Sequence, residues 1–156
     1  MTPYPLPITH YPLPLSHQSS DLKLDHIGIA VRDLEVALKY YRALGLEPST
    51  REVVAGEGVE VVVLPLGGTR LELLRPLGED TPAGRFIAKR GEGLHHIGLA
   101  VPDIRVTLAR CKAAGLELID DEPHPGAEGR LVAFVHPKSA GGVLIELTEE
   151  SKRVSE

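Results

Sequence analysis

An internal repeat dominates this sequence. Residues 26–47, HIGIAVRDLEVALKYYRALGLE, align with residues 96–117, HIGLAVPDIRVTLARCKAAGLE, at a constant offset of 70 residues and without a gap. About half of the aligned positions are identical. Self-similarity at a fixed offset indicates that one structural unit occurs twice in a chain. We therefore expect two copies of one module.

Each copy opens with the pattern of a strand followed by a helix. In the first copy, the apolar run from Ile27 to Val31 predicts a strand. Asp33 then stands where a helix N-cap is expected, and Gly45 follows the amphipathic stretch as a stop signal. The second copy repeats these features at Ile97 to Val101, Asp103 and Gly115. Both copies thus predict a strand that leads into a capped helix.

Further strand-like runs, divided by turn residues, follow each helix. They lie at residues 52–54, 59–66 and 70–74 in the first copy, and at 116–119, 130–136 and 143–148 in the second. The pattern predicts an α+β fold of two tandem βαβββ modules, about residues 22–90 and 92–150, whose paired curved mixed sheets surround a central metal site. At 156 residues we expect one such domain, over residues 21–156.

The first twenty residues differ from the rest of the chain. PYPLPIT is nearly repeated as HYPLPLS, and proline suits neither a helix interior nor a central strand. We interpret residues 1–20 as an extended arm in which His10 and His17 are incidental. This segment lacks a secretory signal pattern, and no later stretch is long and apolar enough to span a bilayer. The sequence therefore predicts no membrane association.

Charge and cysteine content exclude several classes of function. The net charge is −5 and no Lys/Arg cluster occurs, so a nucleic-acid-binding surface is not expected. Cys111 is the one cysteine, which excludes an intramolecular disulfide and a zinc site built from several thiolates. We expect a cytoplasmic protein.

Metal-binding chemistry follows from the alternation of side chains along a strand. His26 shares a strand face with Gly28 and Ala30, whereas the aliphatic residues between them face the helix layer. The last strand of each copy carries one Glu between two aliphatic residues. If the two copies pair about a pseudo-two-fold axis, four candidate ligands converge: His26, Glu72, His96 and Glu146. Two imidazoles and two carboxylates suit one divalent ion, namely Mg²⁺, Mn²⁺, Co²⁺, Ni²⁺, Fe²⁺ or Zn²⁺.

His95 competes with His96 for the ligand position in the second copy. Adjacent strand residues face opposite sides of a sheet, so only one of them points toward the candidate metal site. The offset of the repeat aligns His96 with His26, and it aligns His95 with Asp25. We therefore select His96.

Three segments resemble a known family. DHIGIAV, GLHHIGLAV and HPKSAGGVLIELTE are similar to the vicinal oxygen chelate superfamily and, within it, to the methylmalonyl-CoA epimerases, over about residues 22–150. The resemblance implies a homodimer, a CoA thioester substrate and a metal held by the four residues named above. Members of the family often carry Gln at the position of Glu72, so this residue departs from one version of the pattern.

The reaction implied is a 1,1-proton transfer that interconverts (2R)- and (2S)-methylmalonyl-CoA through a metal-stabilised enolate. Glu146 is our first candidate for one of the two acid/base groups. Family members often carry the second as a Glu three residues after the Gly of a Gly-Val pair. Here Gly58-Val59 is followed by Val61 at that place and by Glu60 one residue earlier. We assign the second role to Glu60, with Glu57 as a weaker candidate.

Lys138, in the HPKS turn, is the candidate for binding the CoA phosphates or the substrate carboxylate. Arg85 and Arg130 are weaker candidates, and His124 and His136 are interpreted as structural or solvated. Two alternatives remain open. One is a glyoxalase I-like lactoylglutathione lyase with the same metal ligands, and the other is a non-catalytic small-ligand-binding protein of the same fold.

Overall fold

The computed structural model describes residues 22–149. The predicted arm at residues 1–20 lies outside the described residues. The first half of the fold consists of β1 (Lys23–Ala30), α1 (Leu34–Ala43), β2 (Thr50–Val54), β3 (Val59–Leu66) and β4 (Thr69–Pro76). The second half consists of β5 (Gly93–Val101), α3 (Ile104–Ala113), β6 (His124–Pro125), β7 (Leu131–Val135) and β8 (Ile145–Glu149). The helix α2 (Pro82–Arg90) joins the halves, and three short 3₁₀ turns are η1 (Ala55–Glu57), η2 (Ala127–Gly129) and η3 (Pro137–Ser139).

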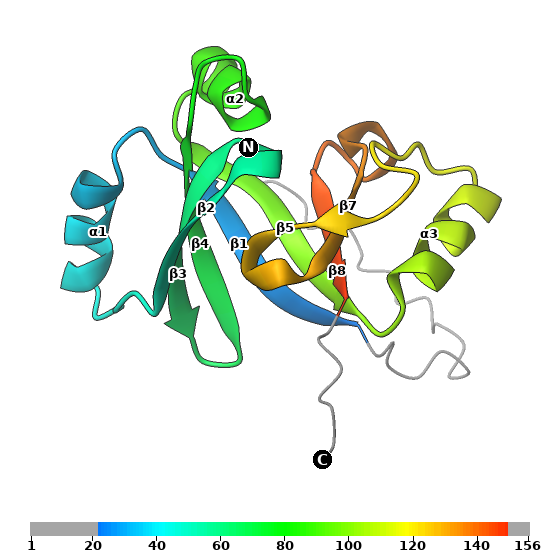
Figure 1. Ribbon diagram of the computed structural model, residues 1–156, viewed down its shortest axis with the longest axis horizontal. Helices are drawn as coiled ribbons and strands as arrows, with labels where there is room; N and C mark the ends of the chain where they lie inside the picture. The colour runs from blue at the N-terminus through cyan, green and yellow to red at the C-terminus, as the bar shows by residue number, and fades with distance from the viewer. Residues whose placement is uncertain (1–21, 150–156) are drawn as a thin grey trace, which may run out of the picture.

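All eight strands belong to one mixed sheet, in the order β2-β3-β4-β1-β5-β8-β7-β6. The pairs β1·β4 and β5·β8 are parallel, and the other neighbours are antiparallel. Figure 1 shows β1 and β5 in the middle of the molecule, with α1 and α3 at its two outer sides. The predicted α+β fold is confirmed, and the two curved halves are continuous through β1 and β5.

The antiparallel pair β1·β5 carries the pseudo-two-fold symmetry of the repeat. Ile27 lies directly opposite Ile97, its equivalent in the repeat, so the symmetry axis passes through this residue pair. On one side His26 lies opposite Gly98, and on the other side Gly28 lies opposite His96. Each half therefore places its histidine against the glycine of the other half.

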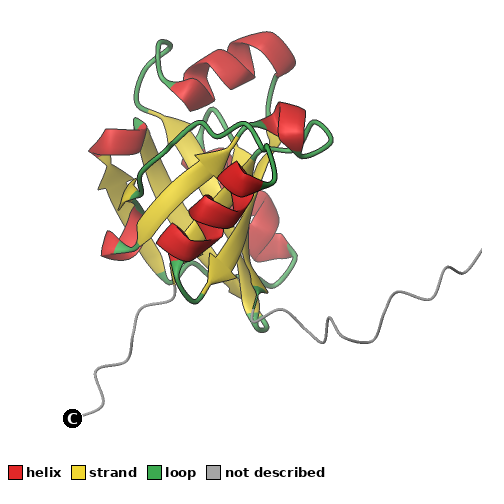
Figure 2. Ribbon diagram, turned by 90° about the vertical axis from the view of Figure 1, so that its right-hand side faces the viewer, coloured by secondary structure: helices red, strands yellow, loops and turns green. Residues whose placement is uncertain are grey.

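The aliphatic face of each half-sheet packs against a helix. Leu34 and Leu38 of α1 contact Leu73 of β4 in one buried cluster. Leu108 of α3 contacts Leu147 of β8 in the equivalent cluster of the second half. Figure 2 shows a helix lying over the outer side of the strands. The helices α1 and α3 thus cover one face of the sheet, as predicted, and the candidate metal ligands lie on the other.

The predicted helix ends are confirmed. The Asp33 side chain accepts a hydrogen bond from the backbone N–H of Val36, and Asp103 accepts bonds from the N–H groups of Arg105 and Val106. Such caps satisfy backbone donors that a helix leaves unpaired in its first turn. Gly45 and Gly115 follow the helices with φ values of 97° and 82°, a left-handed conformation that favours glycine.

Sequence analysis missed α2. The hydroxyl of Thr81 accepts a hydrogen bond from the N–H of Gly84, Pro82 occupies the first turn, and Gly91 ends the helix. Thr-Pro at the start and Gly at the end are recognised helix signals. The helix is only nine residues long and lies outside the repeat, so neither periodicity nor self-comparison revealed it.

The strand predicted at residues 116–119 is wrong. In the described structure this segment makes one isolated bridge, from Leu118 to Val135, and the short edge strand β6 comes later. The side chain of Asp120 accepts a hydrogen bond from the backbone N–H of Phe134, which replaces a backbone partner in the ladder. Pro123 and Pro125 have no N–H to donate, and such residues confine a strand to a sheet edge.

Within residues 22–149, no helix is both long and apolar enough to cross a membrane.

Candidate metal centre

Two histidines and two glutamates meet on the inner face of the sheet. His26 Nε2 lies 2.9 Å from His96 Nε2, 3.0 Å from Glu72 Oε2 and 2.5 Å from Glu146 Oε2. His96 Nε2 lies 3.0 Å from Glu146 Oε2. One ligand atom from each residue fits within 4.8 Å of all the others, and all four residues are buried. We call this group the four-residue cluster, and the structure brings together the four ligands that the repeat predicted.

Strand register explains why these residues converge. Glu72 on β4 lies beside Gly28 on β1, and Glu146 on β8 lies beside Gly98 on β5. Neighbouring residues at the same register position share a face of a sheet. Glu72 therefore points to the same side of the sheet as His96, which lies across from Gly28. Glu146 points to the same side as His26, which lies across from Gly98.

Glycine at positions 28 and 98 is a steric requirement. A Cβ atom at Gly28 would overlap the imidazole of His96, and one at Gly98 would overlap the imidazole of His26. Both rings are buried, so a Cβ atom at either position would displace a buried imidazole. The two rings meet edge to face, with their centroids 5.0 Å apart. The HIG triplet in each copy thus supplies both a ligand and the space for the ligand of the other copy.

Burial and mutual contact shift the ionisation of the cluster. Burial lowers the pKa of His26, but hydrogen bonds with Asp25 and Glu146 outweigh it and raise the pKa to about 10. Burial likewise raises the pKa of Glu146, but hydrogen bonds from both histidines lower it to about 2. Burial raises the pKa of Glu72, with a further contribution from the negative charge of Glu146. Two carboxylates held this close together favour a cation between them.

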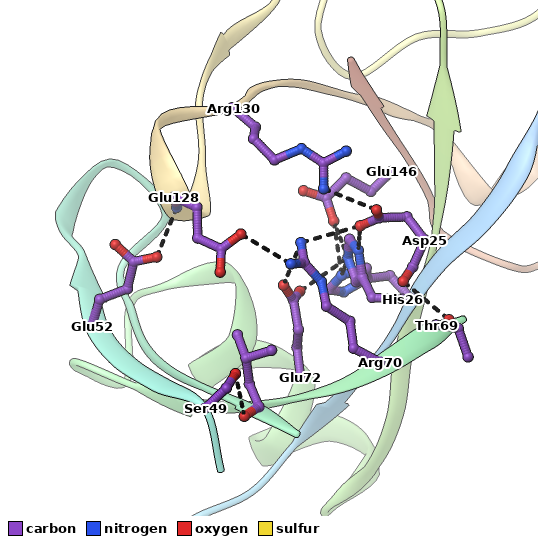
Figure 3. A network of polar contacts seen from close by, with 12 residues as sticks. Asp25, His26, Ser49, Glu52, Thr69, Arg70, Glu72, Glu128, Arg130 and Glu146 are labelled. Atoms are coloured by element: carbon purple, nitrogen blue, oxygen red, sulfur yellow. Dashed lines mark hydrogen bonds and ion pairs between the residues drawn. The ribbon is translucent and has the colours of Figure 1, made fainter. Parts of the chain in front are cut away.

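The first histidine is oriented by a buried ionic network. Asp25 Oδ2 lies 2.7 Å from His26 Nδ1, which directs Nε2 toward the cluster. Arg130 and Arg70 donate to the Asp25 carboxylate at 2.8 and 3.2 Å, as Figure 3 shows. Burial raises the pKa of Asp25, but the hydrogen bond with His26 and the two arginines outweigh it and hold the pKa well below its usual range. Sequence analysis did not assign this role to Asp25, although the repeat singled it out as the equivalent of His95.

The second histidine has a different partner. His95 Nδ1 lies 2.9 Å from His96 Nδ1, so an imidazole stands where the first half has a carboxylate. His95 also meets the ring of Phe86 edge to face. Burial lowers the pKa of His95 to about 4, and the neighbouring His96 adds to this shift. The residue that competed with His96 in the sequence therefore supports it in the structure.

The turn η2 ties the second half of the fold to the first. Glu128 forms an ion pair with Arg70 at 2.9 Å, and its backbone N–H donates to Glu52 on β2 at 2.7 Å. Figure 3 shows this connection beside the cluster. Glu128 has φ of 59°, an uncommon conformation for a residue other than glycine. The contacts of Glu128 with Arg70 and Glu52 therefore link the two halves of the fold and hold Glu128 in this uncommon conformation.

Two adjoining cavities open at the cluster. The first has a volume of about 740 Å³ and lies between η1 and β2 on one side and Phe134 and His124 on the other. The second, of about 540 Å³, lies along α2 and is lined by Arg85, Phe86 and Lys89 among others. His95 and His96 line both cavities. A small molecule in either cavity would therefore reach the edge of the cluster.

The structure does not bring the other predicted site residues to the cluster. Glu60 lies opposite Arg75 in the β3·β4 pair and bonds with Arg51, which also pairs with Glu35 of α1. It therefore points to the helix-covered face, away from Glu72, because the two residues differ by one step in strand alternation.

Lys138 is exposed in η3 and lines neither cavity, although its neighbour Pro137 lines the second one. Arg130, a weaker candidate for binding CoA, is bound to Asp25. His136 accepts a hydrogen bond from the backbone N–H of Lys138, which agrees with a structural role. His124 was interpreted in the same way, but it lines the first cavity.

Comparison with known proteins identifies the family. Residues 25–134 match the model of the glyoxalase/bleomycin resistance protein/dioxygenase superfamily. The ethylmalonyl-CoA/methylmalonyl-CoA epimerase of Cereibacter sphaeroides is 42% identical over 130 residues, which cover 81% of this chain and 97% of the relative. The chain belongs to the methylmalonyl-CoA epimerase family. The human mitochondrial methylmalonyl-CoA epimerase is 40% identical over 129 residues, covering 81% of this chain and 73% of that protein.

A solved member of the epimerase family has the same fold. A methylmalonyl-CoA epimerase variant from Streptomyces coelicolor, in complex with 2-nitronate-propionyl-CoA, superimposes with a TM-score of 0.81 and 37% identity. The match covers 86% of this chain and 98% of that protein. These relatives carry epimerase names, so they do not favour the lyase or the non-catalytic alternative.

Proposed function

We propose that this protein is a metal-dependent epimerase that interconverts (2R)- and (2S)-methylmalonyl-CoA. The observation that carries the proposal is the buried four-residue cluster at the meeting point of two cavities, in a chain about 40% identical to known epimerases. Removal of the proton at C2 leaves an enolate, whose negative charge needs stabilisation inside the protein.

The cluster fits a divalent metal ion. Its donors are two imidazole nitrogens and two carboxylates, all buried and close enough to share one ion. Carboxylates this close are costly to bury without a cation. His26, Glu72, His96 and Glu146 would hold the ion, which when bound would act as a Lewis acid for two substrate oxygens. The same donors suit Mg²⁺, Mn²⁺, Co²⁺, Ni²⁺, Fe²⁺ and Zn²⁺, so our proposal does not choose among them.

The residues around the cluster have distinct roles in this proposal. Asp25 and His95 orient the two imidazoles through their Nδ1 atoms. Phe134 lies opposite Glu146 in the β7·β8 pair and lines the first cavity, so it limits access of water to that carboxylate. Glu146 is our candidate for one of the two groups that exchange a proton with C2.

The second cavity suits the CoA portion of the substrate. Its rim carries Arg85, Lys89 and Arg90 on one face of α2, together with the apolar Phe86 and Leu94. Clustered cations bind phosphate groups, and apolar side chains offer contact area to the rest of an acyl-CoA. Lys138 extends the same rim from η3, because Pro137 beside it lines this cavity.

The decisive experiment is deuterium incorporation. Purified protein, loaded with Co²⁺ or Mn²⁺, is incubated in deuterated water with (2R)- or (2S)-methylmalonyl-CoA. We expect deuterium at C2 together with appearance of the other epimer, followed by mass spectrometry and chiral analysis. Protein treated with a chelator is the control. If metal-loaded protein exchanges neither epimer, the epimerase proposal is rejected.

We also propose a homodimer, from the resemblance to the family, and a cytoplasmic location, from the low cysteine content. Light scattering coupled to size-exclusion chromatography measures the first directly. A mass near 16.8 kDa would indicate a monomer and contradict the dimer.

A further inference from the structure

The inner face of β3 carries no group that could transfer a proton. Val59, Val61 and Val63 lie on this face, in the same buried cluster as Leu74 of β4. Glu60 stands on the other face with Arg51 and Arg75. An acid/base group for the second face of C2 must therefore come from another segment of the cavity wall.

Six ionisable residues line the first cavity. They are Glu52, Glu57, His95, His96, Asp120 and His124. Glu52 accepts the N–H of Glu128 at 2.7 Å, and Asp120 accepts the N–H of Phe134 at 2.8 Å. The two adjacent histidines, 95 and 96, are bonded to each other. These contacts already occupy four of the six groups.

Glu57 is the carboxylate that remains. Its Oε1 is buried and has no hydrogen-bond partner in the described structure, and His124 Nε2 lies at ion-pair distance, 3.7 Å away. The residue ends the turn η1, and Gly58 after it adopts φ of 68°, which turns the chain into β3. A buried carboxylate oxygen without a hydrogen bond is costly for stability, so its presence calls for an explanation outside folding.

The environment of Glu57 suits proton transfer. Burial, together with the charges of Glu146, Glu72 and Asp120, raises its pKa to about 8 against the opposing charge of His26. A carboxyl group with a pKa near neutrality is protonated in part of the molecules and can act as acid or as base. The four-residue cluster is thus close enough to influence Glu57, although Glu57 does not belong to it.

We propose that Glu57 is the second acid/base group of the reaction and works with Glu146 on opposite faces of C2. The inference rests on the proposed epimerase function. In one direction, Glu146 takes the proton as the C2–H bond breaks and its electron pair forms the enolate. Glu57 then donates its proton to the opposite face, and the electron pair forms the new C2–H bond. The reverse direction exchanges the roles, and solvent resets both groups.

Glu57→Gln tests the assignment with a side chain of nearly the same shape. Epimerisation should fall by about 10²- to 10⁴-fold, as expected when a general acid or base is lost. In deuterated water, the variant should still exchange the C2 proton of the one epimer that faces Glu146, without inversion. Glu47→Gln, at a side chain 77% exposed, is the matched control and should keep the full rate.

Several outcomes would overturn the assignment. One is a Glu57→Gln rate within a few fold of the wild type, and another is loss of exchange from both epimers while the wild type stays active. A full rate in Glu57→Gln combined with loss of activity in Glu60→Gln would transfer the role to Glu60. If Glu57→Gln does not fold, Glu57→Ala is judged by the same two readouts. A wild type that exchanges neither epimer instead rejects the epimerase function itself.

Discussion

The two halves of this molecule agree in their candidate metal ligands and differ in the residues that surround them. Each half contributes one histidine from its first strand and one glutamate from its last strand. Asp25 and His95 occupy equivalent positions beside these histidines, but Asp25 lies in an ionic network and His95 lies against the ring of Phe86. The full-length β2 corresponds to the two-residue β6. The repeat thus fixes where the four-residue cluster lies, and the diverged segments decide which side chains line the cavities beside it.

The largest expected effect is a loss of metal affinity when either Gly28 or Gly98 is replaced, and it tests whether the two glycines are equivalent. Gly28→Ala and Gly98→Ala each place a methyl group in the space of a ligand imidazole. We expect metal affinity to fall by at least about 100-fold, since even partners outside the ligand set cost 10- to 100-fold. Titration calorimetry with Co²⁺ measures this, and unfolding in urea should show a loss of about 1–3 kcal/mol from overpacking.

Gly68→Ala is the matched control for the glycine variants, because nothing lies within 4 Å of an added Cβ there. Its affinity should equal that of the wild type. If Gly28→Ala binds Co²⁺ as tightly as Gly68→Ala, the imidazole of His96 is not a ligand.

Metal removal tests whether the cluster couples the halves. Two ligands come from each half, so a bound ion should stabilise both together. At a free concentration 100 times the dissociation constant, we expect about 2.7 kcal/mol of added free energy of unfolding. Hydrogen exchange of β4 and β8 should slow together on adding Mn²⁺. Protection of one strand without the other would show that the ion binds to one half alone.

Asp25 and His95, the partners of the two cluster histidines, should contribute unequally to metal affinity. Asp25→Asn removes a charge-assisted bond to His26 and weakens the contacts with Arg70 and Arg130, so metal affinity should fall by about 10- to 100-fold. His95→Gln removes a neutral partner and should have a smaller effect. Equal losses in the two variants, measured by Co²⁺ titration, would contradict the asymmetry.

The Asp25 carboxylate also predicts a pH dependence. Its folded pKa lies below the ordinary value of 3.8, so its contribution to stability is fully present above that pH. The contribution is lost as the pH falls below 3.8 and the carboxylate takes up a proton. Wild type and Asp25→Asn should therefore converge in free energy of unfolding toward acid pH. A difference that stays constant between pH 6 and about 3 would contradict this linkage.

The smallest expected effect is the loss of a helix N-cap, which should cost the same stability in both halves. Asp33→Ala and Asp103→Ala each remove an N-cap and should cost about 1 kcal/mol of unfolding free energy. Urea unfolding measures both, with Glu47→Gln as an exposed control. A loss in one half that greatly exceeds the other would show that the repeated helices differ in their contribution to stability.

Much of this protein is determined by the sequence alone. The repeat predicted the strand, cap, helix and glycine stop of each half, and its offset selected His96 over His95. These features can be predicted from the sequence because they depend on local chemistry, on the side-chain period of two in a strand and on the fixed offset of the repeat. The convergence of the four ligands followed from the repeat, since equivalent strands related by a two-fold axis bring equivalent residues together.

Tertiary structure decided the rest. Asp25, Arg70 and Arg130 are far apart in sequence, and only the pairing of β1 with β4 and the return of η2 bring them together. Glu57 and Glu60 look alike as glutamates beside Gly58, but the left-handed turn at Gly58 sends them to different faces. The Glu60 carboxylate is neutralised by arginines, whereas Glu57 keeps one buried oxygen that makes no hydrogen bond. The sequence names both residues, but only the path of the chain through the turn separates their environments.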